Sequence, residues 1–336
     1  MTRIRIAVLL LVVFSAILSG CGNAGAEGGT VSLKLAYVMA PRGPAHEAAE
    51  YLAKIVEERS GGTLQITLYP GAQLGTDREL AEALKLGSID LVLGGTAPIG
   101  WYAPQYGAIE MPYVFRDYPH MDAVLRGQIG EEMKQAMLSA QGLRILDFWH
   151  RGPRYLTANK PVRTPEDLAG LKLRVPELPT YIEAWRALGA NVTPVTYSEI
   201  FIALKQGVVE GQENPLEVVH TSSLYEVQRY IMETQHLLGV YIMMMSDARW
   251  SRLSEEHRTI LSQAVIDAGQ FERERMLEYE QTYRDDLAKK GMQFVTVDHA
   301  AFRSRVLDTV PRQFASQWAP NLFERIQGTE VAHATP

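Results

Sequence analysis

The 336-residue sequence contains a single cysteine, Cys21, and no excess of positive charge. One cysteine permits neither an intramolecular disulfide nor a metal cluster held by several thiolates. The 33 Lys and Arg residues against 39 Asp and Glu give a formal net charge of -6, so the surface repels nucleic acid. The eight histidines are scattered without metal-ligand spacing. We therefore expect no nucleic-acid partner, no metal and no cofactor, and any anionic ligand needs locally placed cations.

Long hydrophobic runs are also lacking, apart from one at the N-terminus. Arg3 and Arg5 precede an apolar run at 6–18 that is short for a bilayer span but typical of a signal peptide, predicted at 1–20. The run ends in Leu-Ser-Gly-Cys21, which resembles the bacterial lipobox and predicts lipidation of Cys21. The lipid would anchor the protein to the membrane, in the periplasm or at the cell surface. An ordinary signal peptide with an incidental cysteine is the alternative. Residues 21–30 are small and polar, as in a flexible tether.

Complete enzyme signatures are missing as well. His46-Glu-Ala-Ala-Glu50 lacks the second histidine of a zinc-binding helix, so His46 is better interpreted as a capping or ligand-contacting residue. Gly95 and Gly100 have P-loop spacing, but Trp101 and Tyr102 stand where the loop needs Lys and Ser or Thr. There is no G-x-S-x-G nucleophile elbow. These departures predict a protein that is not an enzyme.

Short β-rich runs alternate with amphipathic helical stretches, a pattern that predicts an α/β fold with parallel strand pairs. The expected strands are 31–38, 64–69, 89–93, 143–149, 154–158, 171–175, 192–195, 237–245 and 292–297. The expected helices are 45–59, 76–85, 179–188, 198–206, a long one at 254–289, and a terminal one from 299. Asp77 and Glu79 complement the dipole of the second helix. Thr164-Pro-Glu-Asp167 has the residues of a helix start.

Three motifs stand in order between 151 and 216: Arg-Gly-Pro-Arg-Tyr-Leu-Thr at 151–157, Thr-Pro-Glu-Asp-Leu-Ala-Gly-Leu-Lys-Leu-Arg-Val-Pro at 164–176, and Val-Glu-Gly-Gln-Glu-Asn-Pro-Leu at 209–216. Further motifs stand at 71–75, 87–90 and 188–194. Together they resemble the periplasmic binding subunit of tripartite ATP-independent periplasmic (TRAP) transporters, the dicarboxylate-binding-protein (DctP) family. The resemblance extends from about residue 31 to the last helix.

The resemblance implies a two-lobed periplasmic-binding-protein fold with mixed sheets and a long bracing C-terminal helix. One lobe is expected to comprise 31–151 plus about 240–275, and the other 152–239 plus about 276–330. A ligand that touches both lobes favours the hinge-closed state. The closed form of this expected monomer then docks onto the TRAP membrane permease, which supplies ion-gradient energy.

The resemblance also implies which residues hold the ligand. Arg174 grips the ligand carboxylate, for which a guanidinium offers two parallel donors. Asn214 donates to that carboxylate or to an adjacent hydroxyl, and an Asx turn before a proline is its alternative role. Arg154 supports the anion, and Tyr197 packs on the solute or in the core. The remaining expected cleft residues, for which packing or solvent roles are the alternative, are Arg151, His46, Trp149 and Glu213.

One departure from the sialic-acid binders of this family indicates the ligand class. Sialic-acid binders of this family carry an acid and an arginine where this chain has Gly95 and Pro98. Small residues at 94–98 leave room for a sugar ring or a polyol chain, so we expect a sugar acid such as a uronate or an aldonate ahead of a C4-dicarboxylate. Two other functions remain open at this point, namely a ligand sensor of the same fold and an exported hydrolase of sugar-acid conjugates.

Overall fold

The computed structural model describes residues 29–331, so the predicted signal peptide and Cys21 lie outside the described residues. The molecule has two halves, one on each side of a pair of long central strands. The first half begins with three parallel strands, β1 (Val31–Ala36), β2 (Leu64–Tyr69) and β3 (Leu91–Gly94). Helices α2 (Pro44–Arg59) and α3 (Asp77–Leu86) connect them. Thr76 and Glu79 form a reciprocal capping box at the start of α3, as expected for an N-cap threonine three residues before a glutamate. These elements confirm the predicted α/β alternation.

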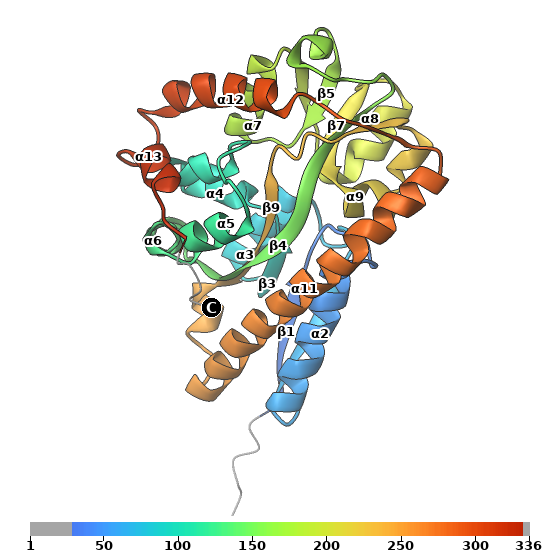
Figure 1. The fold of residues 1–336 in the computed structure, drawn as a ribbon. Coiled ribbons are helices and arrows are strands. Elements are labelled where there is room, and N and C mark those ends of the chain that lie inside the picture. Colours follow the sequence, from blue (N-terminus) through green and yellow to red (C-terminus); the bar gives the residue numbers. More distant parts are fainter. Residues whose placement is uncertain (1–28, 332–336) are drawn as a thin grey trace, which may run out of the picture.

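Two long antiparallel strands, β4 (Leu143–Ala158) and β9 (Leu238–Ser246), run through both halves of the molecule (Figure 1). The second half adds β5 (Lys172–Val175), β6 (Asn191–Pro194) and β7 (Gly211–Pro215), giving the strand order β2-β1-β3-β9-β4-β7-β5-β6. β8 (Tyr230–Met232) pairs with β4 and with β10 (Gln293–Val295). Parallel and antiparallel pairs therefore occur in one sheet, which confirms the mixed α/β class.

The sequence predicts two strands where the structure has β4 alone. Gly152 and Pro153 suggested a break, because proline cannot donate to a ladder and glycine weakens a strand. In the structure β9 pairs with β4 up to Pro153 and β7 pairs with it from Arg154 onward, and the irregularity is a register shift between Arg151 and Pro153. Such a shift bends a strand and re-aims its side chains. The prediction of a gap was wrong, because β9 and then β7 keep the pairing of β4 continuous.

The other helices lie around this sheet. They are α4 (Ala97–Tyr102), α5 (Tyr118–Leu125), α6 (Gln128–Gln141), α7 (Pro179–Ala187), α8 (Ile200–Lys205), α9 (Leu216–Thr221) and α10 (Asp247–Trp250), with 3-10 turns η1 (Pro104–Glu110), η2 (Pro165–Leu168), η3 (Tyr197–Glu199) and η4 (Leu224–Glu226). The predicted helix start at Thr164 forms only the single turn η2, because Gly170 at φ 74° ends it before β5. Among residues 29–331, no helix is both long and apolar enough to cross a bilayer.

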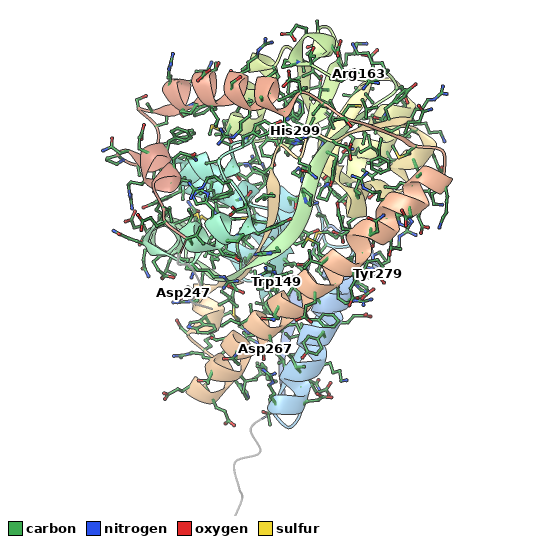
Figure 2. All side chains as sticks on the ribbon, in the orientation of Figure 1. Trp149, Arg163, Asp247, Asp267, Tyr279 and His299 are labelled. Carbon is green, nitrogen blue, oxygen red and sulfur yellow. The ribbon has the colours of Figure 1, made fainter. Side chains whose placement is uncertain are left out.

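The long helix α11 (Glu255–Lys289) braces the molecule, as predicted. It packs on α2 and β4 in the first half and on α9 in the second, and Figure 1 shows it running diagonally across both. Trp149 lies beneath it (Figure 2), where the indole Nε1 donates to the carbonyl of Val265 at 3.0 Å. Helix α12 (His299–Phe314) then covers α7, and α13 (Leu322–Gln327) returns to the first half beside η1. A large buried core connects the sheet to most of the helices, and a second buried cluster joins α8, α9 and β8 to the C-terminal part of α11.

Candidate ligand-binding site

A cavity lies where the two halves meet, with an empty volume of about 660 Å³ including its opening to solvent. From the first half it receives Val38, Met39, Asp77, Gly95, Thr96 and Ala97, which follow β1 and β3 or begin α3. From β4, β9 and the second half it receives Arg151, Arg154, Arg174, Pro176, Leu178, Tyr181, Tyr197, Asn214, Leu237, Gly239 and Val240. Ligands of α/β proteins bind beyond the carboxyl ends of the parallel strands, and the first-half residues occupy that position. The site is mostly apolar with a few convergent polar groups, as binding pockets are.

Arg174 is a buried cation without a carboxylate partner. It stands on β5 between buried Leu173 and Val175, and only 3% of its surface is exposed. Its Nε donates to the carbonyl of Val195 at 2.8 Å, and no carboxylate within residues 29–331 comes within 4.0 Å of it. Burial lowers the pKa of Arg174 to about 10. An anion in the cavity would therefore gain a charge-assisted interaction that the protein itself does not satisfy.

Arg154 is held differently, in a buried ion pair with Glu213. Its Nε donates to Glu213 Oε2 at 2.5 Å and its Nη2 to Oε1 at 2.8 Å, while Nη2 also reaches Asn214 Oδ1 at 3.0 Å. Burial opposes ionisation of Glu213, but the charge of Arg154 and a hydrogen bond with His236 outweigh it and lower the pKa of Glu213 to about 2. The pair is thus fully ionised and neutral overall.

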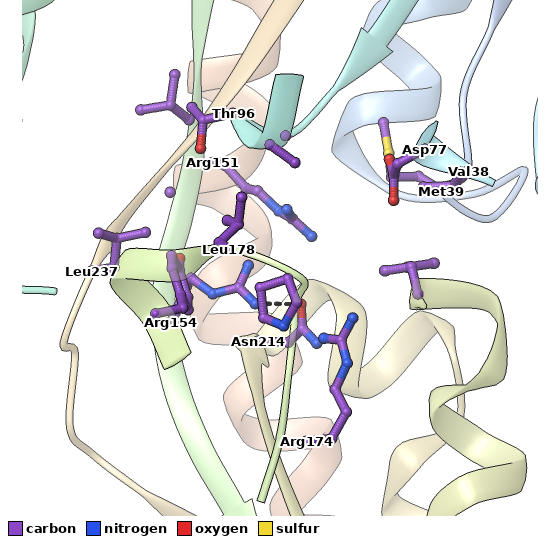
Figure 3. Close-up of a pocket in the computed structure, with 17 residues that line it drawn as sticks. Val38, Met39, Asp77, Thr96, Arg151, Arg154, Arg174, Leu178, Asn214 and Leu237 are labelled. Carbon is purple, nitrogen blue, oxygen red and sulfur yellow. Dashed lines mark hydrogen bonds between the residues drawn. The ribbon is translucent and has the colours of Figure 1, made fainter. Parts of the chain in front are cut away.

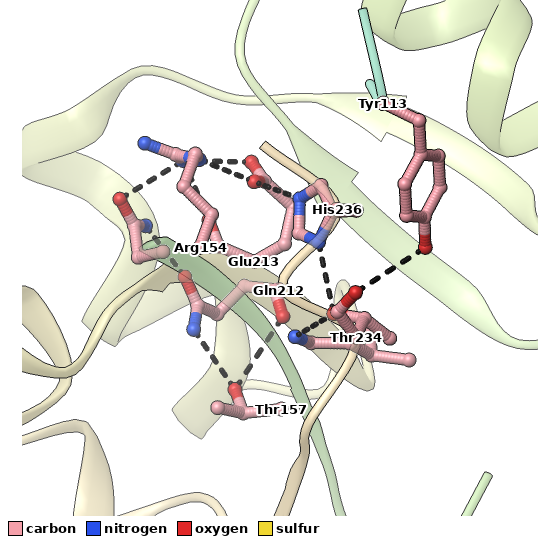
Figure 4. Close-up of polar contacts among 9 residues, drawn as sticks. Tyr113, Arg154, Thr157, Gln212, Glu213, Thr234 and His236 are labelled. Carbon is pink, nitrogen blue, oxygen red and sulfur yellow. Dashed lines mark hydrogen bonds and ion pairs between the residues drawn. The ribbon is translucent and has the colours of Figure 1, made fainter. Parts of the chain in front are cut away.

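A polar network behind the cavity wall fixes these groups (Figure 4). His236 Nε2 lies 2.9 Å from Glu213 Oε2, and its Nδ1 lies 2.9 Å from Thr234 Oγ1. Asn214 donates from Nδ2 to Gln212 Oε1 at 2.6 Å, and Gln212 donates onward to Thr157 at 2.9 Å. Burial lowers the pKa of His236, so its ring is neutral and supports Glu213 by hydrogen bonding. Satisfied networks of this kind hold a site in one geometry.

Arg151 and Asp77 complete the charged groups of the cavity. Arg151 sits at the irregularity of β4, with its Cζ 4.7 Å from the ring centre of Tyr241, and its Nε has no hydrogen-bond partner among the described residues. Asp77 is the first residue of α3. Burial raises its pKa, and the charges of Arg151 and Arg174 act against that rise. Figure 3 shows Asp77 on the side of Val38 and Met39, facing the arginines across the cavity.

The mouth of the cavity, where a neighbouring hollow shares Asp77, Arg174 and Tyr197 with it, is bridged by side chains from both halves. Trp101, on α4, donates from Nε1 to the carbonyl of Glu177 at 3.2 Å. Arg78 stacks on the Trp101 ring at 4.2 Å, and its Nη2 lies 3.8 Å from the Glu177 carboxylate. Glu177 follows β5 in the second half. These contacts hold the two halves together over the cavity.

The structure brings together most of the residues that the sequence suggested. Arg174, Arg154, Arg151, Asn214 and Tyr197 all line the cavity. The Tyr197 hydroxyl lies 3.3 Å from Ser222 Oγ, so its ring faces the cavity while its hydroxyl is already paired.

Three other expected residues lie outside the cavity lining. Glu213 pairs with Arg154 from behind the wall. His46 lies on α2, with Nδ1 2.6 Å from the Tyr37 hydroxyl, and Trp149 is 1% exposed beneath α11. Sequence reasoning placed these residues near the cleft by their position along the chain, which does not show the direction of a side chain.

Sequence reasoning also missed residues. Asp77 was assigned to the dipole of its helix, although its position directly after the 71–75 motif was a usable signal. Tyr181 and Leu178 gave no signal beyond apolar spacing, and His236 gave none. Within residues 29–331, no group of three or more His, Cys, Asp or Glu side chains could hold a metal ion.

Comparison with known proteins identifies close similarities over nearly the whole folded chain. The sequence profile described as bacterial extracellular solute-binding protein, family 7 (DctP), matches residues 35–317. A solute-binding protein of Roseobacter denitrificans is 34% identical over 290 residues, covering 86% of this chain and 89% of that protein. The sialic acid-binding periplasmic protein of Vibrio cholerae is 35% identical over 224 residues, covering 67% and 70%.

Comparison with solved structures gives the same kind of protein. A TRAP periplasmic solute-binding protein from Bordetella, with density assigned to pantoate, superposes with a TM-score of 0.85 at 34% identity, covering 90% of this chain and 100% of that one. The Roseobacter denitrificans protein with bound L-galactonate gives 0.83 at 32% identity, covering 90% and 99%. A Sulfurospirillum deleyianum protein of the same kind, with bound succinate, gives 0.84 at 28% identity, covering 90% and 100%.

Proposed function

The chain belongs to the bacterial extracellular solute-binding proteins of family 7, and we propose that it captures a sugar acid, such as an aldonate or a uronate, in the cavity between its two halves. Members of this family are the extracytoplasmic binding subunits of TRAP transporters and are not enzymes. The proposal accordingly assigns the chain to uptake, in which its ligand-bound form docks onto the membrane permease.

The observation that carries the proposal is the unpaired Arg174 inside the cavity. A buried guanidinium without a counterion is unfavourable, and a ligand carboxylate would remove that cost while forming two parallel hydrogen bonds. Asn214 and Arg154 stand next to it with their orientation already fixed by Gln212 and Glu213. The cavity is therefore preorganised for a carboxylate, and less ordering is required when the ligand binds.

A sugar acid fits the remaining lining better than a simple dicarboxylate. Thr96 and Asp77 offer polar groups opposite the arginines, where hydroxyl groups of a polyol chain would lie. Relatives with 30% or more identity include a protein described with L-galactonate and one named for 2,3-diketo-L-gulonate. The protein with succinate, at 28% identity, keeps a C4-dicarboxylate as the second candidate.

The two halves are proposed to act as hinged lobes. One comprises 31–151 with about 240–275, and the other 152–239 with about 276–330; the last helix, α13, reaches back to the first half. The arginines and Asn214 come from β4, β5 and β7, whereas Asp77 and Thr96 come from the opposite side. A ligand contacts both sides only when they are close, so its binding energy favours the closed state.

Attachment to the membrane is proposed to occur through Cys21. Signal-peptide cleavage before this residue and lipidation of its thiol would leave residues 21–30 as a tether for a monomeric binding domain. Labelling of the expressed protein with a radioactive fatty acid, compared with Cys21→Ser, tests this directly. Labelling that persists in the Cys21→Ser variant would rule out the anchor.

A thermal-shift screen of the soluble chain from residue 29 onward tests the function. The compounds are hexonates and hexuronates, C4-dicarboxylates, and the corresponding neutral sugars and polyols. A ligand that binds only the folded state raises the melting temperature. We expect stabilisation by a sugar acid and none by its neutral counterpart. Stabilisation by neutral sugars alone, or by none of these compounds, would contradict the proposal.

A further inference from the structure

The charges that line the cavity are divided between its two sides. Arg154 and Arg174 stand on β4 and β5, and Arg151 stands at the register shift of β4. Apart from Arg151 on the connecting strand β4, the first half supplies Asp77 and Thr96 to the lining and no cation. Figure 3 shows this division, with Asp77 beside Val38 and Met39 and separated from the arginines by the cavity. One end of a bound ligand therefore faces cations and the other faces an acceptor.

The balance of these charges limits how many negative charges the ligand can carry. Arg154 is neutralised by Glu213 through the two contacts at 2.5 and 2.8 Å. Arg151 and Arg174 have no carboxylate within 4.0 Å among residues 29–331, and Asp77 is the one acidic side chain in the cavity lining. Two uncompensated cations and one acid leave a single positive charge, which one carboxylate balances.

Two acids behind Arg151 support the same limit on the negative charge of the ligand. Glu217, on α9, and Glu272, on α11, are buried near Arg151. Burial raises the pKa values of both carboxyl groups, and the charge of Arg151 acts against that rise. Any negative charge on either group would reduce the positive charge available to a ligand, so a second ligand carboxylate would find no compensating cation.

On the basis of the proposed function, we propose that the cavity selects a monocarboxylate bearing hydroxyl groups, with Asp77 accepting hydrogen bonds from hydroxyls distal to the carboxylate and excluding a second carboxylate by charge repulsion. Specificity of this kind combines an attractive and a repulsive element in one side chain. An ionised carboxylate is an acceptor only, so hydroxyl donors suit it. Hydrogen bonds from the ligand also favour the ionised form of Asp77.

Hydroxyls fit this balance better than an ammonium group would. A zwitterion could place its ammonium on Asp77 and its carboxylate on Arg174, but it carries no net charge and would leave the extra positive charge of the cavity uncompensated. A hydroxylated monoanion satisfies Asp77 and balances the charge at once. The ligand of the Bordetella structure, pantoate, is of this chemical type, whereas succinate in the Sulfurospirillum structure is not.

Matched pairs of sugar acids test the proposal by isothermal titration calorimetry. Galactonate and galactarate, gluconate and glucarate, and mannonate and mannarate differ within each pair only in whether the terminal carbon is a primary alcohol or a carboxylate. We expect the wild-type protein to bind the monoacid of the preferred pair at least about tenfold more tightly, since like charges placed together cost several kcal/mol. Equal or tighter binding of the diacid would overturn the proposal.

The variant Asp77→Asn assigns the selectivity to this side chain, and Asp308→Asn, at an exposed position of α12, is its matched control. Asp77→Asn is expected to weaken monoacid binding, strengthen diacid binding and reduce their ratio about tenfold or more. The control should leave the ratio unchanged. An unchanged ratio in Asp77→Asn would remove the selectivity from Asp77, and the wild-type ratio remains a test if that variant does not fold.

Two further results separate this inference from the proposed function. If a diacid binds, titrations in buffers of different ionisation enthalpy show whether a proton is taken up, as protonation of Asp77 would require. Diacid binding as tight as that of the monoacid would leave sugar-acid capture intact and overturn only the monoacid selectivity. If no member of any pair and no hexuronate binds, the proposed ligand class and this inference fail together.

Discussion

Arg154 and Glu213 form a buried two-point ion pair in the wall of the cavity, with Nε to Oε2 at 2.5 Å and Nη2 to Oε1 at 2.8 Å. Glu213 is fully buried, and His236 occupies the remaining side of its Oε2. The pair neutralises one of the three arginines that line the cavity and leaves Arg174 available for a ligand. Glu213 is thus a positioning residue for the site and a structural element of the second half.

Glu213→Gln is expected to lower the free energy of unfolding by about 3 kcal/mol, because removal of one partner leaves a buried charge uncompensated. Urea denaturation of the ligand-free protein measures this. Glu183→Gln is the matched control, since Glu183 pairs with Arg186 on the exposed face of α7, and its cost should stay below about 1 kcal/mol. Similar losses in both variants would contradict the assigned role of the buried pair.

In contrast to Glu213→Gln, Arg174→Met should not lower the free energy of unfolding. Arg174 has no counterion, so replacing it by an apolar side chain of similar length removes a desolvation cost. We expect the ligand-free variant to be as stable as the wild type or more so by about 1 kcal/mol. A melting temperature well below that of the wild type would show that Arg174 stabilises the fold.

Trp101→Ala removes the bridge over the cavity mouth. The Trp101 contact with the Glu177 carbonyl and the stacking of Arg78 join the two halves, so their loss should favour the open state. We expect a several-fold faster ligand release in stopped-flow fluorescence, with a smaller change in the association rate. Trp250→Ala, which removes a partly buried tryptophan on α10 away from the cavity, is the control. Identical release rates for Trp101→Ala and wild type would exclude a closing role.

Glu110 predicts a pH dependence of stability. It is 1% exposed, and burial raises its pKa to about 8, opposed by a hydrogen bond from Thr96. Because the folded state keeps a proton that the unfolded state loses above about pH 4.5, the contribution of this group to stability is complete below that pH and is lost as pH rises through about 8. The full effect is on the order of 5 kcal/mol.

The variant Glu110→Gln should therefore reduce the loss of stability between pH 5 and pH 9, as measured by urea denaturation at both values. Glu324→Gln, at an exposed position on α13, serves as the control and should retain the wild-type slope. A Glu110→Gln variant with the same pH dependence as the wild type would show that Glu110 ionises in the folded state near its ordinary pKa.

The extent to which the sequence predicts this structure depends on the kind of feature. Helices such as α11 and strands such as β2 are predicted well, because their apolar spacing reflects burial on one face. The continuity of β4 is not predictable locally, since it depends on pairing with β9 and β7, both far along the chain. The same holds for the division of roles between the arginines, because only the fold brings Glu213 against Arg154.

The same difference between local and long-range features applies to the site residues. Arg174 and Asn214 belong to motifs whose spacing marks them as functional, and they line the cavity. His46 and Trp149 stand near cavity residues along the chain, but their side chains contact Tyr37 and Val265 and do not line the cavity. Asp77 was predicted to serve its own helix, because an acid in a first turn has a sufficient local explanation.

The central claim is that Arg174 binds the carboxylate of the ligand, and a calorimetric titration of a bound sugar acid into Arg174→Ala tests it most directly. Arg186→Ala, on the exposed face of α7, is the control for loss of an arginine. We predict that Arg174→Ala weakens binding well over tenfold, since a charge-assisted hydrogen-bonded pair contributes about 1.5 to 3 kcal/mol or more, while the control binds as the wild type does. Unchanged affinity in a folded Arg174→Ala protein would contradict the account.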